Sequence, residues 1–311
     1  MMHSFMREQA VVELGGVRFG GQPGENPTVL FGTLFYGREF KTLDDKTLTK
    51  AKEYVVGQES LSRETGIAGL IDVYIKDAKD IEKELNLVLD STDLPFSIDS
   101  SDAETRAAAL GWLAKAGALD RTVYNSINLG VTEDEIKALE KHTPAAAIVL
   151  GYNPRDMSVD GRADILSSGA GMVCVKDTGL LDLARDAGVE GILLDTGATP
   201  FGSMSAETLR AIPVFKNQFG LPVGCSIHNT LESWSWMKEH RREHQEAYDC
   251  ADAAANSMVP LMSGDFIVYG PISSYGRIFP SIAFADKLVA EGSADYFGVK
   301  VSDSHPYFKL E

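Results

Sequence analysis

The amino-acid sequence predicts a (β/α)8 barrel, an α/β fold of the TIM-barrel type. Eight apolar runs of strand length recur along the 311 residues, and segments with helical periodicity separate them. Most of these runs are apolar on both faces, as are parallel strands that helices cover. A doubly wound sheet is the alternative, but no GxGxxG motif follows the first run.

The expected strands follow one another at intervals that mostly leave room for a helix. Residues 1–27 precede the first strand, and their Gly- and Pro-rich stretch GGVRFGGQPGENP is expected to cover the lower end or edge of the barrel. The stretch 174–189 could hold an extra short strand. No second domain boundary is visible, so we expect one barrel domain over residues 1–311, with 1–27 as an N-terminal extension. The expected strands are 28–34, 69–74, 95–99, 121–125, 145–151, 190–195, 221–227 and 265–269.

Start and stop signals mark several of the helices between these strands. SDAETRAAALGWLAKAG opens with Ser101 or Asp102 as the N-cap and ends at Gly117. VTEDEIKALEKH begins at Thr132 with Glu135 three residues on, which is the pattern of a capping box. Similar helical periodicity and end signals occur in three more segments: DDKTLTKAKEYVVGQESLSRETG, SAETLRAIPVFKNQFG and SIAFADKLVAEG.

Composition and charge argue against nucleic-acid binding and membrane insertion. The chain is 44% hydrophobic and 24% charged, and no apolar run approaches the ~18 residues of a membrane span. A net charge of −16 repels polyanions. The three cysteines form no CxxC or Cys/His cluster, so neither a disulfide framework nor a structural zinc is implied. We expect a cytoplasmic protein without a membrane span, a nucleic-acid partner or a metal site.

Four of the expected strands end in polar side chains that are poor strand formers. Asp99, Asn125 and Asp195 end the third, fourth and sixth strands, and His228 with Asn229 ends the seventh. In a parallel barrel the carboxyl ends of all strands open on one face, where active sites lie. We therefore expect these side chains to converge on one mouth and to line a pocket there.

Carboxylates and an amide at one mouth can bind the donor–acceptor edge of a flat heterocycle. An ionised carboxylate accepts two N–H bonds from an amino-pyrimidinone, and a carboxamide both donates and accepts. A glycosidase-like use of Asp99 and Asp195 stays open, as does a metal-binding triad of these two with His228. Acyl transfer is disfavoured because no serine lies in a GxSxG context.

Secondary candidates lie next to these strand ends. Ser126 and Asn128 follow the fourth strand, and Gly270 lies in YGPISSYGR after the last one, where backbone N–H groups could form an anion nest. Asn128 could equally stabilise a turn, and so could Asp195. His228 could be a structural histidine at the mouth rather than a functional one.

Four strings resemble one family: GGQPGENPTVLFGTLFY, FSIDSS, VYNSIN and LLDTGATPFG. They look like the H subunit of tetrahydromethanopterin S-methyltransferase and its soluble bacterial relatives, the methylcorrinoid protein:tetrahydrofolate methyltransferases of glycine betaine demethylation systems. The resemblance runs from about residue 15 to residue 275. More distantly, the polar strand ends are similar to those of other pterin-binding TIM barrels.

The resemblance implies a role for each of four residues. Asp99, Asn125 and Asp195 would bind the pyrimidine edge of the pterin, and Asn229 would be the catalytic residue beside N5. The implied reaction moves a methyl group from cobalamin, carried by a partner corrinoid protein, to N5 of tetrahydrofolate. Its product would be 5-methyltetrahydrofolate.

Alternatives within the same resemblance stay open. The pterin could be tetrahydromethanopterin, or the chain could be a non-catalytic subunit of a methyltransferase complex. Dihydropteroate synthase chemistry is less favoured because the chain lacks a Lys/Arg-rich diphosphate site. The resemblance also implies a homodimer that pairs through its outer helices.

Overall fold

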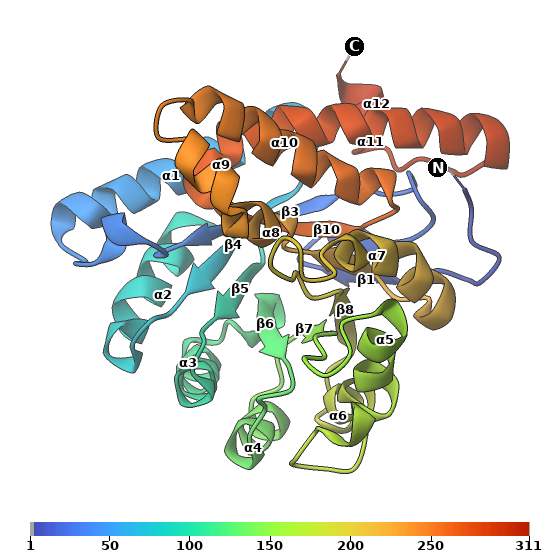
Figure 1. The fold of residues 1–311 in the computed structure, drawn as a ribbon. Helices are drawn as coiled ribbons and strands as arrows, with labels where there is room; N and C mark the ends of the chain where they lie inside the picture. The colour runs from blue at the N-terminus through green and yellow to red at the C-terminus, as the bar shows by residue number, and fades with distance from the viewer. Residues whose placement is uncertain (1–2, 311) are drawn as a thin grey trace.

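A closed barrel of eight parallel strands forms the centre of the computed structural model, which describes residues 3–310 (Figure 1). The last strand pairs with the first barrel strand and closes the sheet. The eight predicted strands are all present and in the predicted order, so the (β/α)8 prediction is confirmed. The strands are β3 (Val29–Leu34), β4 (Gly69–Tyr74), β5 (Phe96–Asp99), β6 (Thr122–Ile127), β7 (Ala146–Leu150), β8 (Gly191–Asp195), β9 (Val223–Cys225) and β10 (Phe266–Pro271).

Helices surround the barrel, and local sequence signals fix the ends of several of them. Asp102 accepts a hydrogen bond from the backbone N–H of Thr105, and Thr132 and Glu135 form the predicted capping box. Gly66 ends the first helix at φ +82°, where a residue with a Cβ would be strained. The helices are α1 (Asp45–Thr65), α2 (Ile81–Ser91), α3 (Ala103–Ala116), α4 (Glu133–Lys141), α5 (Val159–Ser167), α6 (Leu180–Asp186), α7 (Ala206–Phe219), α8 (Ile227–Ser233), α9 (Ser235–His240), α10 (Gln245–Leu261), α11 (Tyr275–Phe297) and α12 (Pro306–Lys309).

The structure corrects two of the predicted elements. The seventh strand ends at Cys225 instead of residue 227, so His228 and Asn229 lie in the first turn of α8 and not at a strand end. The stretch 174–189 contains helix α6 and no strand. Short apolar runs do not distinguish a strand from the buried side of a helix, and both errors fall in such runs.

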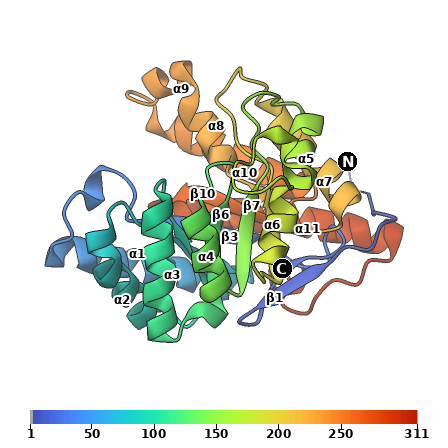
Figure 2. The same ribbon diagram turned by 90° about the horizontal axis from the view of Figure 1, so that it is seen from below.

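A two-stranded hairpin, β1 (Val11–Leu14) and β2 (Val17–Gly20), lies across the amino-terminal end of the barrel. Phe19 is fully buried there, and its ring stacks on Phe31 at 6.0 Å between centroids. Figure 2 shows β1 at one end of the molecule, and α8 and α9 at the other. The hairpin thus covers the lower end of the barrel and leaves the carboxyl ends of the strands as its open mouth.

No helix within residues 3–310 combines the length and apolarity needed to cross a bilayer.

Candidate functional site

The carboxyl ends of the barrel strands open into a cavity of about 840 Å³. Its volume lies in the range that encloses a small-molecule ligand. The structure brings together seven of the eight site residues expected from the sequence. The cavity is lined by Asp99, Asn125, Ser126, Asp195, His228, Asn229 and Gly270.

Asn128 is the exception, because it does not line the cavity. Its side-chain oxygen accepts the N–H of Gly130 at 2.9 Å, and its amide nitrogen donates to the carbonyl of Ser126 at 3.0 Å. These bonds make Asn128 a turn residue after β6. Its selection as a possible site residue is therefore corrected.

The floor of the cavity holds a carboxylate that the sequence reasoning missed. Asp72 lies inside β4, is 1% exposed, and accepts hydrogen bonds from Thr33 Oγ1 at 3.0 Å and Ser97 Oγ at 2.5 Å. Asn125 Nδ2 donates to the same carboxylate at 3.1 Å. Because a carboxylate only accepts, the amide nitrogen must point toward it, and the carbonyl oxygen of Asn125 is left for a ligand.

Asp72 and Asp99 place two acidic side chains in the same part of the cavity. Burial raises the pKa of Asp72, and burial together with the charge of Asp72 raises the pKa of Asp99 well above its usual range. Arg106 acts in the opposite direction, but its guanidinium is bound to Glu135 at 2.7 Å. Both shifts favour the protonated form of these carboxyls, and a protonated carboxyl can donate a hydrogen bond where a carboxylate only accepts.

Asp195 is the second acidic group of the cavity, at the end of β8. Its Oδ1 accepts the N–H of Gly197 at 2.7 Å, so the turn-stabilising role considered from the sequence is present. Arg162 holds the same turn by donating to the carbonyls of Thr196 and Gly197 at 2.7 and 2.6 Å. Burial raises the pKa of Asp195 to about 6, while the Gly197 N–H and Arg162 oppose that rise. Asp195 is thus a charged acceptor at neutral pH.

His228 and Asn229 form the side of the cavity nearest α8. Asn229 is exposed, and its side chain has no hydrogen-bond partner within residues 3–310. The ring of His228 packs against Gly270, where an added Cβ would lie 2.4 Å from Cδ2 and 2.6 Å from Nε2. Glycine at position 270 therefore makes room for the imidazole at the cavity wall.

Aromatic rings lie beside this mouth, on the loop after β8, at the junction between α8 and α9, and on α9. Phe201 stacks on Trp234 at 4.8 Å, Trp234 lies 5.0 Å from Trp236, and Trp236 stacks on His240 at 4.6 Å. Phe201 and Trp236 are each 54% exposed. We call these four residues the ring ladder; it lies next to Lys238 of the cavity rim, which carries a positive charge.

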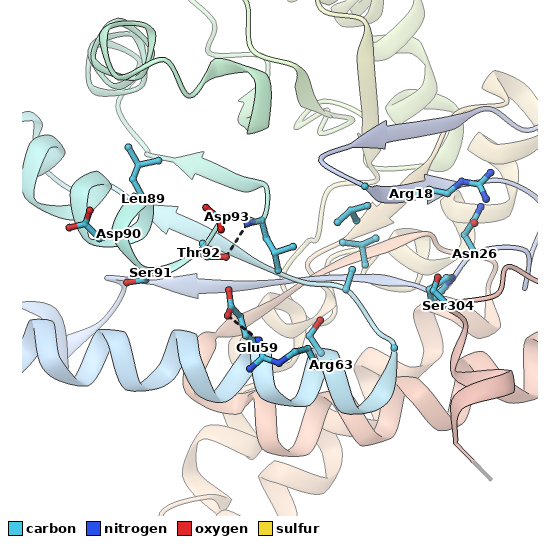
Figure 3. Close-up of a pocket in the computed structure, with 18 residues that line it drawn as sticks. Arg18, Asn26, Glu59, Arg63, Leu89, Asp90, Ser91, Thr92, Asp93 and Ser304 are labelled. Atoms are coloured by element: carbon cyan, nitrogen blue, oxygen red, sulfur yellow. Dashed lines mark hydrogen bonds and ion pairs between the residues drawn. The ribbon is translucent and has the colours of Figure 1, made fainter.

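A second cavity of about 630 Å³ lies at the opposite end of the molecule, next to the hairpin (Figure 3). Arg18 and Asn26 lie on one side of it, and Glu59 and Arg63 of α1 lie on the other. Glu59 and Arg63 pair with each other at 3.5 Å as an exposed i,i+4 pair. Active sites of TIM barrels lie at the carboxyl ends of the strands, so we assign the functional site to the mouth.

Among residues 3–310, no group of three His, Cys, Asp or Glu side chains is arranged to hold a metal ion. His228, Asp99 and Asp195 share the cavity but do not form such a group.

The sequence matches the family model described as "Tetrahydromethanopterin S-methyltransferase MtrH subunit" over residues 7–301. A relative from Methanothermobacter marburgensis, named as the H subunit of tetrahydromethanopterin S-methyltransferase, is 38% identical over 313 residues, which cover 99% of this chain and 100% of the relative. A relative from Methanosarcina mazei, named as the H subunit of the putative methyltransferase mtx, is 35% identical and covers 98% of each chain.

Solved structures with the same fold include two dihydropteroate synthases. The Yersinia pestis enzyme, solved with a sulfonamide drug complex, has a TM-score of 0.62 at 14% identity, covering 91% of this chain and 100% of that one. The Thermus thermophilus enzyme has a TM-score of 0.55 at 18% identity, covering 87% and 97%. At this identity the likeness shows a shared barrel fold.

Proposed function

The chain belongs to the tetrahydromethanopterin S-methyltransferase MtrH subunit family, and we propose that it moves a methyl group from a methylated corrinoid protein to N5 of tetrahydrofolate. The product is 5-methyltetrahydrofolate, and the partner carries the methyl group on cobalamin. In this proposal the chain acts as one barrel domain in the cytoplasm. The family is one of methyltransferase subunits, which supports the reaction type.

The observation that carries the proposal is the acidic and amide lining of the mouth. Asp195 offers a charged acceptor, Asn125 offers a carbonyl oxygen, and Asp72 and Asp99 add two more carboxyl groups to the same lining. The pyrimidine ring of a pterin carries N–H donors and ring nitrogen and carbonyl acceptors on one edge. Such a lining complements that edge, and burial excludes the water that would compete for it.

Asn229 is the residue we propose to act at N5. It lies in the first turn of α8, is exposed, and lines the same cavity as the deeper carboxylates. With the pyrimidine edge on the floor, the opposite side of the pterin faces this rim. An attacking nitrogen and a methyl donor need alignment and charge stabilisation more than acid or base chemistry, and a free amide at the rim can supply both.

The ring ladder supports a corrinoid-carrying partner. A methyl group on cobalt can reach N5 only if the macrocycle comes to the open mouth, which these exposed rings adjoin. The adjacent segment KEHRREH (238–244) holds three cations, two histidines and two glutamates, and so is net positive in a chain whose net charge is −16. Flat aromatic rings beside positive charge fit a large planar ligand that carries a phosphate.

Methyl transfer from free methylcobalamin to purified protein and pterin tests the proposal. We expect 5-methyltetrahydrofolate to form with tetrahydrofolate, together with the cob(I)alamin absorption spectrum. Transfer only to tetrahydromethanopterin would show that this pterin, and not tetrahydrofolate, is the methyl acceptor. The names of the relatives favour that alternative. Pterin binding without transfer to either pterin would instead indicate a non-catalytic subunit.

Pterin affinity is expected to depend on the ionisation of Asp195. Its pKa of about 6 in the free protein means that the carboxylate is charged at pH 8 and mostly protonated at pH 5. A ligand that binds the ionised form is lost as the pH falls through that pKa, by about tenfold at one unit below it. Calorimetric titration of tetrahydrofolate at pH 5 and pH 8 measures this difference. The Asp195→Asn variant is the control and should lose this part of the pH dependence.

We also propose that the chain forms a homodimer through α10 and α11, which lie side by side (Figure 1). Met258 and Leu261 of α10 are 47% and 41% exposed, and Phe284 and Leu288 of α11 are 67% and 38% exposed. The two residues of each helix are spaced three or four apart and so share a face. A second copy of the chain would bury this apolar patch and leave both mouths open.

The Phe284→Asp variant is expected to be monomeric by light scattering at micromolar concentration, where the wild type is dimeric. A charge at the centre of a buried apolar interface is strongly unfavourable, while at an exposed position it leaves the barrel folded. Val56→Asp on α1 introduces the same charge at a 59% exposed apolar site and should stay dimeric. A monomeric wild type would contradict the proposed dimer.

A further inference from the structure

A buried chain of polar contacts leads from the cavity wall to the outer helices. His228 Nδ1 lies 2.8 Å from Asp252 Oδ1 of α10, and Asp252 has no exposed side-chain surface. Arg277 of α11 binds the other oxygen of Asp252 through Nε at 3.1 Å and Nη2 at 2.8 Å. Asn256 Nδ2 also donates to Asp252 Oδ1, at 3.2 Å. The proposed function uses none of these three partners.

These contacts fix the ring orientation and the tautomer of His228. Asp252 accepts two hydrogen bonds from Arg277 and one from Asn256, and a carboxylate only accepts hydrogen bonds. The proton of a neutral imidazole must therefore lie on Nδ1. Nε2 is then left with a free lone pair on the ring edge that packs against Gly270 at the cavity.

We propose that His228 accepts the proton that N5 loses, and that Asp252 and Arg277 are positioning residues that hold it in the required form. The inference deepens the proposed transfer to N5 and rests on it. A carboxylate that orients an imidazole through Nδ1 is a known way to prepare Nε2 as a base. His228 and Asn229 are adjacent in α8, so a base and an amide lie at the same rim.

The methyl transfer needs no reactant other than the pterin, the methylated cobalt and His228. The lone pair of N5 attacks the methyl carbon, the N–C bond forms, and the cobalt–carbon bond breaks with both electrons left on cobalt as Co(I). N5 began with one hydrogen and now carries a positive charge. Its proton moves to Nε2 of His228, and the resulting imidazolium is stabilised by the Asp252 carboxylate.

Other charged groups around the ring are themselves paired. Glu232 lies one turn further along α8 and is bound by Arg241, at 2.5 Å, and by the hydroxyl of Tyr248. Asp249 of α10 pairs with Arg277 at 3.2 Å. Asp252 is thus the one acidic side chain within residues 3–310 that contacts the His228 ring directly.

Two measurements on the full-length protein test the inference. The ¹⁵N chemical shifts of the His228 ring, assigned by comparison with His228→Ala, should show a protonated Nδ1 and an unprotonated Nε2 in the wild type. In Asp252→Asn an amide can donate to Nδ1, which moves the proton to Nε2. We expect this variant to lower kcat for transfer from methylcobalamin by about tenfold or more, with the dissociation constant for tetrahydrofolate unchanged.

Two further variants distinguish the proposed roles of Asp252 and His228 from a general loss of structure. Glu246→Gln removes an acid from the same helix at a 79% exposed side chain and should leave kcat unchanged. His228→Ala should lose activity that added imidazole partly restores, whereas a purely structural histidine would not be rescued.

Three outcomes would overturn the inference: an Nε2–H tautomer in the wild type, wild-type kcat in Asp252→Asn, or full activity in His228→Ala. The tautomer measurement holds even if the Asp252 variant does not fold. A wild type that transfers methyl to neither pterin would instead overturn the proposed function itself, and with it the role of His228.

Discussion

The Asn229→Ala variant is expected to lower kcat for methyl transfer by about 10²-fold while changing tetrahydrofolate affinity little. The carbonyl oxygen of Asn229 can accept the N5–H as N5 becomes positive, and loss of one positioned hydrogen-bonding group that meets developing charge typically costs ~10²–10³ in kcat; the small charge change at N5 favours the low end. Asn229 is exposed at the rim, and its side chain has no partner within residues 3–310, so its removal leaves no buried group unsatisfied. The fold should therefore be unaffected.

Steady-state kinetics with methylcobalamin and tetrahydrofolate measure this effect. A contact made mainly in the transition state lowers kcat and kcat/KM together, whereas a uniform binding contact raises KM alone. Asn128→Ala is the matched control, because Asn128 is a turn residue that does not line the cavity, and its kcat should match the wild type. Full activity in Asn229→Ala would remove that residue from the mechanism.

The second large effect is expected at Asp195, where Asn should weaken tetrahydrofolate binding by ten- to a hundredfold. The loss of a charge-assisted hydrogen bond is worth ~1.5–3 kcal/mol. One oxygen at this position accepts the Gly197 N–H, so an asparagine would keep its carbonyl there and turn its NH₂ toward the ligand. Two donors would then face each other at the recognition edge.

The Asp99→Asn variant is expected to lose less tetrahydrofolate affinity than Asp195→Asn, as measured by calorimetric titration at pH 8. Burial and the charge of Asp72 raise the pKa of Asp99 well above its usual range, so Asp99 ionises less readily than Asp195. A neutral amide at Asp99 therefore changes the charge of the free site less, and we expect less than tenfold weakening. Unchanged affinity in both variants would contradict the assignment of the mouth to the pterin edge.

The barrel was predictable because its signals are local. Each strand is a short apolar run, and several helices carry their own periodicity and caps, such as Asp102 and the Thr132–Glu135 box. The polar ends at Asp99, Asn125 and Asp195 could be placed at one mouth because parallel strands open on the same face. The family resemblance was likewise carried by contiguous strings, and the family match confirms it.

Local signals failed where neighbouring elements decide the outcome. The run around VGCSIHNT was expected to continue as a strand, yet it turns into α8 after Cys225. Asn229 reaches the cavity from a helix as a result. Asn128 has the same residue type and a similar setting in the sequence, but its bonds within the turn keep it out of the cavity.

By itself the sequence determined the strand order, the ends of several helices such as α1, α3 and α4, and the face on which the polar strand ends gather. Only the tertiary structure placed Asp72 beside Thr33, Ser97 and Asn125, residues from three other strands, and set His228 against Asp252, 24 positions away. The physical reason is the distance along the chain between the residues that interact. Periodicity and capping act within a few residues, whereas these contacts exist only after barrel closure fixes the register of strands and the packing of helices that are distant along the chain.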